Sequence, residues 1–492
     1  MIWGWGTRPA TAATVPMRIG IDFGTSYSAA AGVVDGTLVH VPFGDQSQFR
    51  TAAYFPRELP EGDDFELTPA LEDEVLALVR TSKRDQDRAL RDHRQRLAQA
   101  ARPNNQADRL AIPEPVVQSD DALTQQAVNT IRRRWLQEQH AREITARDSL
   151  SSAQFGEGAI DAYIDDPRGR LFQSPKSMIG FKLLPGVQEV VQTVLTSILS
   201  HIRITAQRHL GQDVDSAVVG RPVHFKSSMG AAGDEQALSI LRDAATAAGF
   251  DHIDFLYEPE AAALDYHLRA ADRHVVLVVD IGGGTCDLCL AQAGGAQDFV
   301  PLQSWGDATG GGDVDYWLNL LRFMGHFGRN IGTSPNHIYS EAAMVSDVVR
   351  QTTFKGYDFS DYAPPYRERL LALQAEANTV RVARAAEQLK IHLSTQAEGA
   401  ASMDYIEPGL GATAQQPDLA AAASFFIARL DRLLETVQSA PFPQPSRILL
   451  TGGGSSAPYV AQAVQARYPG VALVRGEPSL AIVSGLAKAA AM

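Results

Sequence analysis

The sequence predicts an α/β protein in which two related lobes face each other across a cleft. The stretch Val275–Gln292 starts with a short apolar run rich in β-branched residues, which is typical of a buried strand. An aspartate, three glycines and a threonine follow this run, and the strand pattern then resumes. Met17–Gly36 repeats the order of strand, aspartate, Gly-Thr turn and strand. Two such units about 260 residues apart favour a duplicated architecture.

Strand and helix patterns alternate between these two units. A strand over Asp215–Arg221 precedes a helix that we expect Asp234 to cap at its N-terminus. A second strand over Ile253–Tyr257 leads into a helix that starts at Glu258. This alternation indicates mixed sheets.

Both repeated turns have the composition of a phosphate-binding loop. The glycines at Gly282–Gly284 allow a tight bend that exposes backbone N–H groups with no Cβ in the way. Asp280 and Asp287 flank this turn, and Thr285 adds a hydroxyl group. Because the turn joins strand to strand, it differs from Rossmann and Walker loops, which open a helix. The matching positions of the first unit are Asp22, Gly24 and Thr25.

The composition bounds the class of protein. The chain has 492 residues, of which 45% are hydrophobic and 21% charged, as in globular proteins with two to four domains or subdomains. Its formal net charge of −13 argues against a nucleic-acid partner. No apolar run reaches the length of a membrane span, and the N-terminus lacks the pattern of a signal peptide. We therefore expect a cytoplasmic protein without a membrane partner.

Two cysteines, Cys286 and Cys289, are the only ones in the chain, so no disulfide framework is expected. Their spacing resembles half of a redox or zinc motif. Within a strand, however, residues three apart point to opposite faces of the sheet. This geometry favours a structural role for both thiols.

The expected domain organisation is a tail followed by two lobes, each with an insertion. No substrate-binding domain is expected beyond the two lobes, since the chain stops at Met492 after a closing helix. The expected ranges are 1–16 for a disordered tail, 17–272 for lobe I with a helical insertion over about 60–150 and a closing helix over 475–492, and 273–474 for lobe II with an insertion over about 313–420.

The first insertion is rich in arginine, and two interpretations are open. Thr81–Arg102 and the triplet Arg132–Arg134 could form a basic binding face. Acidic residues are interleaved with these arginines in the sequence, which favours a solvated helix surface.

Three further segments carry candidate site residues. Lys176 stands on a turn between a proline and Ser-Met-Ile-Gly, from which it could reach into a cleft. Glu387, Lys390 and Ser394 share one face of a helix. The strand that ends at Thr451 runs into a third glycine turn, which opens a helix.

In this order the motifs resemble the heat shock protein 70 (DnaK-type) family of the actin-like ATPase superfamily. The resemblance covers about residues 17–492, through GIDFGTSYS, AVVGRPVHF, YEPEAAALDY, VVDIGGGTCDL, GGGDVDYWL, AEQLKIHLS and ILLTGGGSSAPYV. FQSPKSMIGF together with AVVGRPVHF resembles the YegD-like subgroup of chaperones. The family implies a two-lobed, ribonuclease H-like fold with duplicated mixed-sheet domains around a nucleotide cleft.

The resemblance also implies roles for individual residues around ATP and Mg²⁺. Lys176 matches a lysine that places the attacking water, Glu258 a carboxylate near metal and water, and Asp280 a further catalytic carboxylate. The residues implied around Mg²⁺, mostly through water, are Asp22, Asp280 and Asp287. Those implied for the phosphates are Gly24, Thr25, Gly283, Gly284 and Thr285. Those implied for adenosine are Glu387, Lys390 and Ser394, with Gly452 and Gly453 beneath it.

Two positions of the nucleotide site depart from the family pattern. Ile391 stands where the family usually has an arginine stacked on adenine, and Ser456 replaces an arginine on the opposite side. These changes predict weaker or less selective binding of the base.

The function that these features predict is a slow, Mg²⁺-dependent ATPase that acts as a nucleotide switch. Phosphoryl transfer needs positioning and charge neutralisation more than covalent chemistry, and the two turns, three aspartates and one lysine supply both. We expect a monomeric chaperone or chaperone-like regulator whose protein partner or co-chaperone responds to the bound nucleotide. The alternatives are a small-metabolite kinase of the same superfamily and a filament-forming relative of actin.

Overall fold

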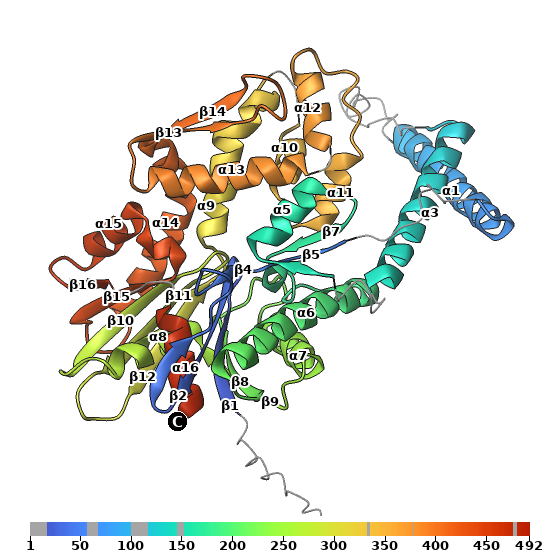
Figure 1. Ribbon diagram of the computed structural model, residues 1–492. Coiled ribbons are helices and arrows are strands. Elements are labelled where there is room, and N and C mark those ends of the chain that lie inside the picture. Colours follow the sequence, from blue (N-terminus) through green and yellow to red (C-terminus); the bar gives the residue numbers. More distant parts are fainter. Residues whose placement is uncertain are drawn as a thin grey trace, which may run out of the picture. The chain divides into compact units, whose positions relative to one another are not determined.

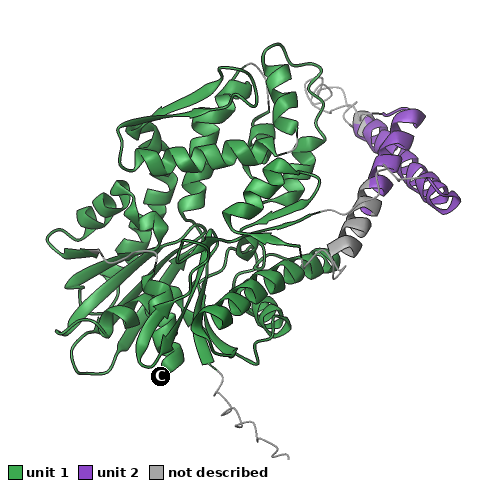
Figure 2. Cartoon of the chain, viewed as in Figure 1, with its two compact units in different colours: residues 1–57, 148–492 green, residues 58–147 purple. Residues whose placement is uncertain are grey.

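The computed structural model describes residues 17–56, 67–99, 117–144, 152–331, 335–375, 377–475 and 480–492. The chain divides into two compact units, one over residues 1–57 and 148–492 and one over residues 58–147 (Figure 2). The tail expected over residues 1–16 lies outside the described residues. Among the described helices, none is long and apolar enough to cross a membrane.

A six-stranded sheet forms the centre of the first lobe, in the order β3-β2-β1-β8-β9, with β4 paired to β2 (Figure 1). β1 is antiparallel to β2 and parallel to β8, and β8 is parallel to β9. The strands are β1 (Met17–Phe23), β2 (Tyr27–Val34), β3 (Thr37–His40), β4 (Phe49–Arg50), β8 (Val214–Arg221) and β9 (His252–Tyr257). A three-stranded sheet beside it contains β5 (Ala52–Phe55), β6 (Gln154–Phe155) and β7 (Arg170–Gln173).

The second lobe has a five-stranded sheet in the order β12-β11-β10-β15-β16. β10 is antiparallel to β11 and parallel to β15, and β15 is parallel to β16. The strands are β10 (His274–Ile281), β11 (Cys286–Ala293), β12 (Val300–Asp307), β15 (Arg447–Thr451) and β16 (Ala472–Arg475). A separate two-stranded sheet contains β13 (Glu398–Ser402) and β14 (Gly411–Gln415).

The two large sheets have the same topology. In each sheet, three consecutive strands form an antiparallel meander. Two more strands, parallel to the first strand of the meander, continue the sheet beyond that first strand. The repeat predicted from the two glycine turns is therefore a repeat of whole sheets. The predicted fold class, a two-lobed actin-like ATPase fold with duplicated mixed sheets, is confirmed. The predicted lobe boundaries stay predictions.

Helices pack on these sheets and connect them. Those of the larger unit are α5 (Glu157–Asp165), α6 (Pro185–Leu210), α7 (Ala231–Ala247), α8 (Glu258–His267), α9 (Gly311–Leu318), α10 (Asn336–Ala343), α11 (Val348–Lys355), α12 (Tyr366–Gln374), α13 (Asn378–Leu393), α14 (Gln416–Ser439), α15 (Pro458–Arg467) and α16 (Ala481–Ala491). Short turns of 3₁₀ or π helix are η1 (Pro175–Ser177), η2 (Asn319–Phe323), η3 (Met324–Phe327) and η4 (Gly453–Ser456).

The helix cap predicted at Asp234 is wrong. Helix α7 begins one turn earlier, after Gly230, whose φ of 59° lies in a region that glycine adopts readily. Asp234 lies in the first turn of the helix, and its carboxylate instead accepts a 2.7 Å hydrogen bond from the backbone N–H of Phe225.

Apolar clusters fill both lobes, and another joins the lobes through α8 and α16. Helix α16 approaches its neighbours so closely that a Cβ at Gly485 would lie 1.8 Å from the carbonyl oxygen of Ala261 in α8. Cys286 belongs to the cluster of the second lobe and Cys289 to the joining cluster, so the thiols point to opposite faces of β11. The prediction that both are buried structural residues is confirmed.

The smaller unit is a helical hairpin of α1 (Pro69–Gln99) and α3 (Asp120–Ile144). The two helices pack through a small apolar cluster of Val75, Val79, Leu123, Ala127 and Ile131.

An aromatic cluster in the first lobe encloses His201 of α6. Its imidazole ring stacks on Phe155 with 4.4 Å between ring centroids, and it also contacts Phe43 and Phe49. Burial, with a smaller contribution from the charge of Arg208, lowers the pKa of His201 to about 4. As pH falls, the unfolded chain therefore binds a proton at His201 at a higher pH than the folded chain does.

We expect acid to destabilise the protein through His201. Below the unfolded-state pKa of 6.5, stability is lost as pH falls towards 4. Between pH 7.5 and 5.0 the loss from this residue should reach at most about 2 kcal/mol. Urea unfolding at both pH values should show that His201→Phe loses less stability than the wild type. His209→Gln, which changes an exposed histidine at the penultimate position of α6, is the matched control. An equal loss in all three proteins would contradict the assignment.

Candidate functional site

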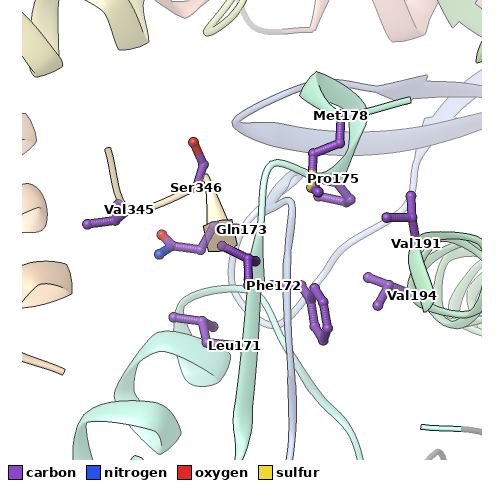
Figure 3. Close-up of a pocket in the computed structure, with 10 residues that line it drawn as sticks. Leu171, Phe172, Gln173, Pro175, Met178, Val191, Val194, Val345 and Ser346 are labelled. Atoms are coloured by element: carbon purple, nitrogen blue, oxygen red, sulfur yellow. The ribbon is translucent and has the colours of Figure 1, made fainter. Parts of the chain in front are cut away.

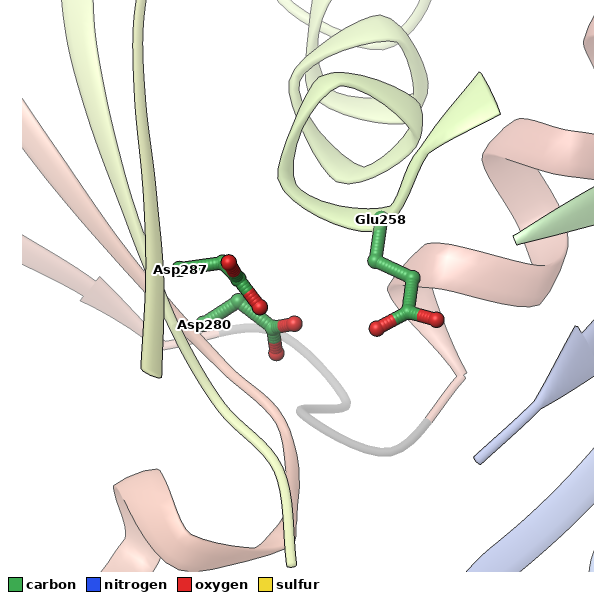
Figure 4. Close-up of side chains that lie close together, drawn as sticks. All are labelled: Glu258, Asp280 and Asp287. Atoms are coloured by element: carbon green, nitrogen blue, oxygen red, sulfur yellow. The ribbon is translucent and has the colours of Figure 1, made fainter. Parts of the chain in front are cut away.

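Three carboxylates converge where the two lobes meet. Asp280 near the end of β10 and Asp287 in β11 are paired directly across the antiparallel hairpin. Glu258 is the first residue of α8, and its side chain points towards the two aspartates (Figure 4). Carboxylate oxygens of the three residues lie within 4.8 Å of one another, and all three residues are buried. Like charges at this distance repel each other, so the arrangement calls for a neighbouring cation.

Lys176 supplies one positive charge. Its Nζ donates a 2.5 Å hydrogen bond to Oε1 of Glu258, and both side chains are less than a tenth exposed. The lysine stands on the 3₁₀ turn η1, where Ser174 before it adopts a left-handed φ of 53°. The turn predicted to carry Lys176 towards a cleft thus brings it to the carboxylate cluster.

Neighbouring groups hold the two aspartates in place. Oδ1 of Asp280 accepts a 3.1 Å hydrogen bond from the hydroxyl group of Thr451. Oδ1 of Asp287 accepts a 3.0 Å hydrogen bond from the backbone N–H of Val223, which belongs to the first lobe. Oδ2 of Asp287 is buried and has no hydrogen-bond partner among the described residues. An unsatisfied buried carboxylate oxygen suggests that a further ligand belongs there.

When no further cation is present, the electrostatics of the site favour the protonated form of its aspartates. Burial, joined by the charge of Glu258, raises the pKa of Asp287 to about 8. Burial and the same neighbour also raise the pKa of Asp280 well above its usual value. Asp22 of the first lobe responds in the same way, with burial first and the charge of Glu258 second.

These residues fit a divalent cation of the Mg²⁺ type. Carboxylate oxygens are the donors that Mg²⁺ prefers, and the orphaned oxygen of Asp287 offers a free lone pair. The close group consists of Glu258, Asp280 and Asp287, whereas Asp22 interacts with it electrostatically from outside that 4.8 Å cluster.

The two glycine turns expected to bind phosphate face each other. A Cβ built on Gly283 would lie 1.9 Å from Oγ of Ser26, and one on Gly284 would lie 2.9 Å from Oγ1 of Thr25. Neither glycine has a positive φ, so close approach of the facing turn, rather than backbone strain, requires glycine here. Gly24 is similarly confined, since its Cβ would lie 2.2 Å from the carbonyl oxygen of Tyr27.

Two of the residues expected to contact adenosine, Glu387 and Lys390, lie on α13 and take part in ion pairs, and Ser394 is the C-cap of this helix. Oε2 of Glu387 accepts a 2.8 Å hydrogen bond from Arg50, which follows the first turn in the sequence. Arg50 also donates to Glu157 at 2.6 Å and to the hydroxyl of Tyr27 at 3.0 Å. This network links the two lobes, because Arg50 and Glu157 belong to the first lobe and Glu387 to the second.

The other expected adenosine residues lie further along the same helix. Nζ of Lys390 donates a 2.8 Å hydrogen bond to Asp315, and the hydroxyl of Ser394 donates to the carbonyl oxygen of Lys390 at 3.1 Å. Ile391 on α13 is 51% exposed, so its side chain is available to a ligand or to solvent.

The third glycine turn contacts the carboxylate site. Gly452 has a φ of 77°, and a Cβ there would lie 2.6 Å from Oδ1 of Asp280. Gly453 opens η4, and a Cβ there would meet no atom within 4 Å. Gly452 therefore borders the predicted metal site, in addition to the adenosine role expected for it.

A small apolar cavity of about 10 Å³ lies beside the turn that carries Lys176 (Figure 3). Pro175 and Met178, on either side of the lysine, line it together with Val191 and Val194 of α6. Val345 and Ser346 close it from the segment before α11. Apolar packing from both lobes thus surrounds the base of the turn, away from the carboxylates.

Sequence reasoning missed Arg50, Thr451 and the backbone N–H of Val223. The sequence carries no signal for Arg50, because its burial and its carboxylate partners depend on the fold. Thr451 ends the strand that pairs with β10, so its hydroxyl could be placed beside Asp280 once the sheet order was known.

We expect Asp287→Asn to stabilise the metal-free protein increasingly as pH rises. Since the folded-state pKa of Asp287 lies above its unfolded value of 3.8, stability is lost as pH rises towards about 8. In a chelator, the advantage of the variant over the wild type should grow by roughly 3 kcal/mol between pH 5 and pH 8. Added Mg²⁺ should raise the melting temperature of the wild type and leave that of the variant nearly unchanged.

Urea and thermal unfolding measure both effects, with Asp243→Asn, an exposed aspartate of α7, as the matched control. A constant difference between Asp287→Asn and the wild type across this pH range would contradict the assignment, as would an equal Mg²⁺ response in the two proteins.

Comparison with known families agrees with the resemblance drawn from the motifs. Residues 177–334 match the family described as "Hsp70 protein". This region contains Glu258, Asp280, Asp287 and the second phosphate turn.

Curated relatives match over partial lengths. A chaperone protein HscA homolog of Cupriavidus pinatubonensis is 32% identical over 34% of this chain and 25% of its own length. The chaperone protein DnaK of Methanothermobacter thermautotrophicus is 33% identical over 26% of this chain and 21% of its own length. An HscA homolog of Pseudoalteromonas atlantica is 34% identical over 28% of this chain and 20% of its own length. The matches span at most a quarter of these relatives and support an Hsp70-family domain in this chain.

Proposed function

We propose that this chain binds ATP and hydrolyses it slowly with Mg²⁺, as a nucleotide switch of the Hsp70 type. The observation that carries the proposal is the buried pair of Lys176 and Glu258 beside two further buried carboxylates. An ion pair with a purely structural role would not explain why Asp280 and Asp287 are buried beside it. A site for phosphoryl transfer explains all four residues, because it needs ligands for a metal ion and a group that orients the nucleophile.

Asp280, Asp287 and Asp22 would hold Mg²⁺, largely through water. When bound, the ion would neutralise charge on the phosphate oxygens. The facing turns around Thr25 and Thr285 would hold the phosphates through their hydroxyl and backbone N–H groups. Each lobe contributes one turn, so a bound phosphate chain would tie the two lobes together.

Lys176 and Glu258 would position the attacking water. The ammonium group offers three donors, of which Glu258 uses one at 2.5 Å. The carboxylate of Glu258 can accept a hydrogen bond from a water molecule on its other oxygen. Together the two side chains would orient a water molecule and exclude others, which lowers the barrier without any covalent intermediate.

Glu387, Lys390 and Ser394 would contact adenosine from α13, above Gly452 and Gly453. Glu387 also accepts a hydrogen bond from Arg50 of the first lobe. The same carboxylate would therefore contact the nucleotide and hold the two lobes together. We therefore propose that the nucleotide state changes how the lobes meet. A protein partner or co-chaperone with different affinity for the two states would be coupled to this change.

An experiment can distinguish this switch from a metabolite kinase. ATP turnover measured with unfolded polypeptides, with candidate sugars and with neither would separate the two functions. Release of inorganic phosphate without an acceptor supports the switch. Phosphate transfer to a sugar, with negligible hydrolysis in its absence, would replace the switch by a kinase.

Replacement of Lys176 by alanine should leave ATP bound and slow its hydrolysis at least tenfold. A tenfold loss corresponds to about 1.4 kcal/mol of activation free energy. The effect should fall on the chemical step, since the lysine acts on the attacking water. Single-turnover hydrolysis and equilibrium binding of ATP measure the two quantities separately.

Lys182→Ala, which removes an exposed lysine six residues away, is the matched control and should hydrolyse ATP at the wild-type rate. If Lys176→Ala fails to fold because Glu258 is left unpaired, Lys176→Met combined with Glu258→Gln removes both charges. A folded variant of either kind that turns over ATP at the wild-type rate would disprove the role.

A further inference from the structure

The helical hairpin of α1 and α3 leaves one long face of α1 without a packing partner among the described residues. Val75 and Val79 of α1 pack against α3, and Leu71 continues this face one turn earlier. Successive residues of an α-helix are separated by about 100° around its axis. The side of α1 opposite these apolar residues is therefore free of apolar contacts within the hairpin.

Four arginines occupy that opposite side. Arg80, Arg84, Arg88 and Arg91 fall within an arc of about 80° on the helix and span about 16 Å along its axis. All four are exposed. We call this group the arginine stripe.

Acidic residues that alternate with these arginines in the sequence lie mostly on another side of the helix. Glu74, Asp85 and Asp92 share an arc that begins about 40° beyond the edge of the stripe. Asp87 lies at the opposite edge, about 20° away, and Asp73 precedes the stripe by two turns. Acidic and basic residues thus alternate along the sequence, but on the helix the arginines form a row that is mostly positive.

The arginine stripe has no side-chain partner among the described residues, whereas Lys83 and Arg134 of the hairpin do. Lys83 lies 2.7 Å from Asp120, and Arg134 pairs with Glu74. No member of the stripe forms a salt bridge or side-chain hydrogen bond within the described part of the chain. Arg80 with Arg84, and Arg84 with Arg88, are like charges four residues apart, which destabilises an isolated helix. Opposite charges at the same spacing, Asp87 with Arg91 and Arg88 with Asp92, offset this cost. Because the stripe has no side-chain partner in the described part of the chain, its guanidinium groups are available to an external one.

We propose that the arginine stripe docks an acidic α-helical segment of a partner protein. Carboxylates repeated every three to four residues on a second helix have the same rise, about 6 Å per four residues, as the arginines of the stripe. Guanidinium groups bind carboxylates through paired N–H donors, so each arginine can engage one acidic side chain.

The same charges could also attract a nucleic acid. Helix α1 has no Phe, Tyr or Trp on which unpaired bases could stack, which disfavours a single-stranded nucleic acid. An acidic helix needs no aromatic residues, and binding of a nucleic-acid duplex is an outcome of the test. This inference is independent of ATP hydrolysis, because the hairpin is a separate compact unit.

The test is a binding titration on the full-length chain. The probe is a fluorescein-labelled, alanine-based peptide of about 20 residues with glutamate at every fourth position, and fluorescence anisotropy reports its binding. The stripe variant combines Arg80→Gln, Arg84→Gln, Arg88→Gln and Arg91→Gln. The wild type should bind the peptide, and the stripe variant should bind at least tenfold more weakly.

A matched control removes four exposed arginines outside the stripe, through Arg96→Gln, Arg208→Gln, Arg367→Gln and Arg432→Gln. This control should bind within about twofold of the wild type, and circular dichroism should show equal helix content in all three proteins. Equal losses in the stripe variant and the control would overturn the proposal, because they would show attraction by net charge alone. Tighter binding of a 20-nucleotide RNA or a 20-base-pair DNA than of the peptide, lost in the stripe variant, would also overturn it.

Discussion

The structure depends on the burial of more negative than positive charge where the lobes meet. Glu258, Asp280 and Asp287 are each at most 6% exposed, and Lys176 is the cation hydrogen-bonded to the group. Transfer of unpaired carboxylates from water into a protein interior is strongly unfavourable. The group can exist with protonated aspartates or with a bound cation. Because burial and neighbouring charge raise the pKa of Asp287 to about 8, this residue is mainly protonated at neutral pH until a cation binds. Folding and ligand binding are therefore linked at this point.

The duplicated sheets place this charge at the lobe interface, but they do not contribute equally. In the second lobe Asp280 is paired across its hairpin with Asp287, whereas in the first lobe the residue paired with Asp22 is Ala29. The second lobe thus carries two carboxylates on adjacent strands, and the first lobe completes the group with Glu258 and Lys176. The backbone N–H of Val223 bridges the lobes at Asp287. A change at the carboxylate group therefore acts on both lobes at once.

Much of this arrangement could be predicted from the sequence because it is local. A strand, a turn of four residues and a second strand fix the pairing of Asp280 with Asp287, and the same period places Cys286 and Cys289 on opposite faces. The bond between Arg50 and Glu387 could not be predicted, since it joins residues 337 positions apart. The start of α7 was mistaken because a glycine turn began the helix before its expected cap. Local patterns determine elements, whereas contacts between distant segments depend on packing.

The arginine stripe shows that the order of charges along the sequence can hide their arrangement on a helix. Between Arg80 and Arg91 the sequence mixes positive and negative residues, so a count of charges predicts a mixed surface. The helical period sorts these residues by angle: the four arginines fall within about 80°, and Asp85 and Asp92 begin about 40° beyond that arc. Screening acts over about 8–10 Å at physiological salt, which is shorter than the stripe, so a partner in contact with it meets the local row more than the net charge. An acidic chain can therefore carry a basic docking face, provided that the face lies on a regular helix.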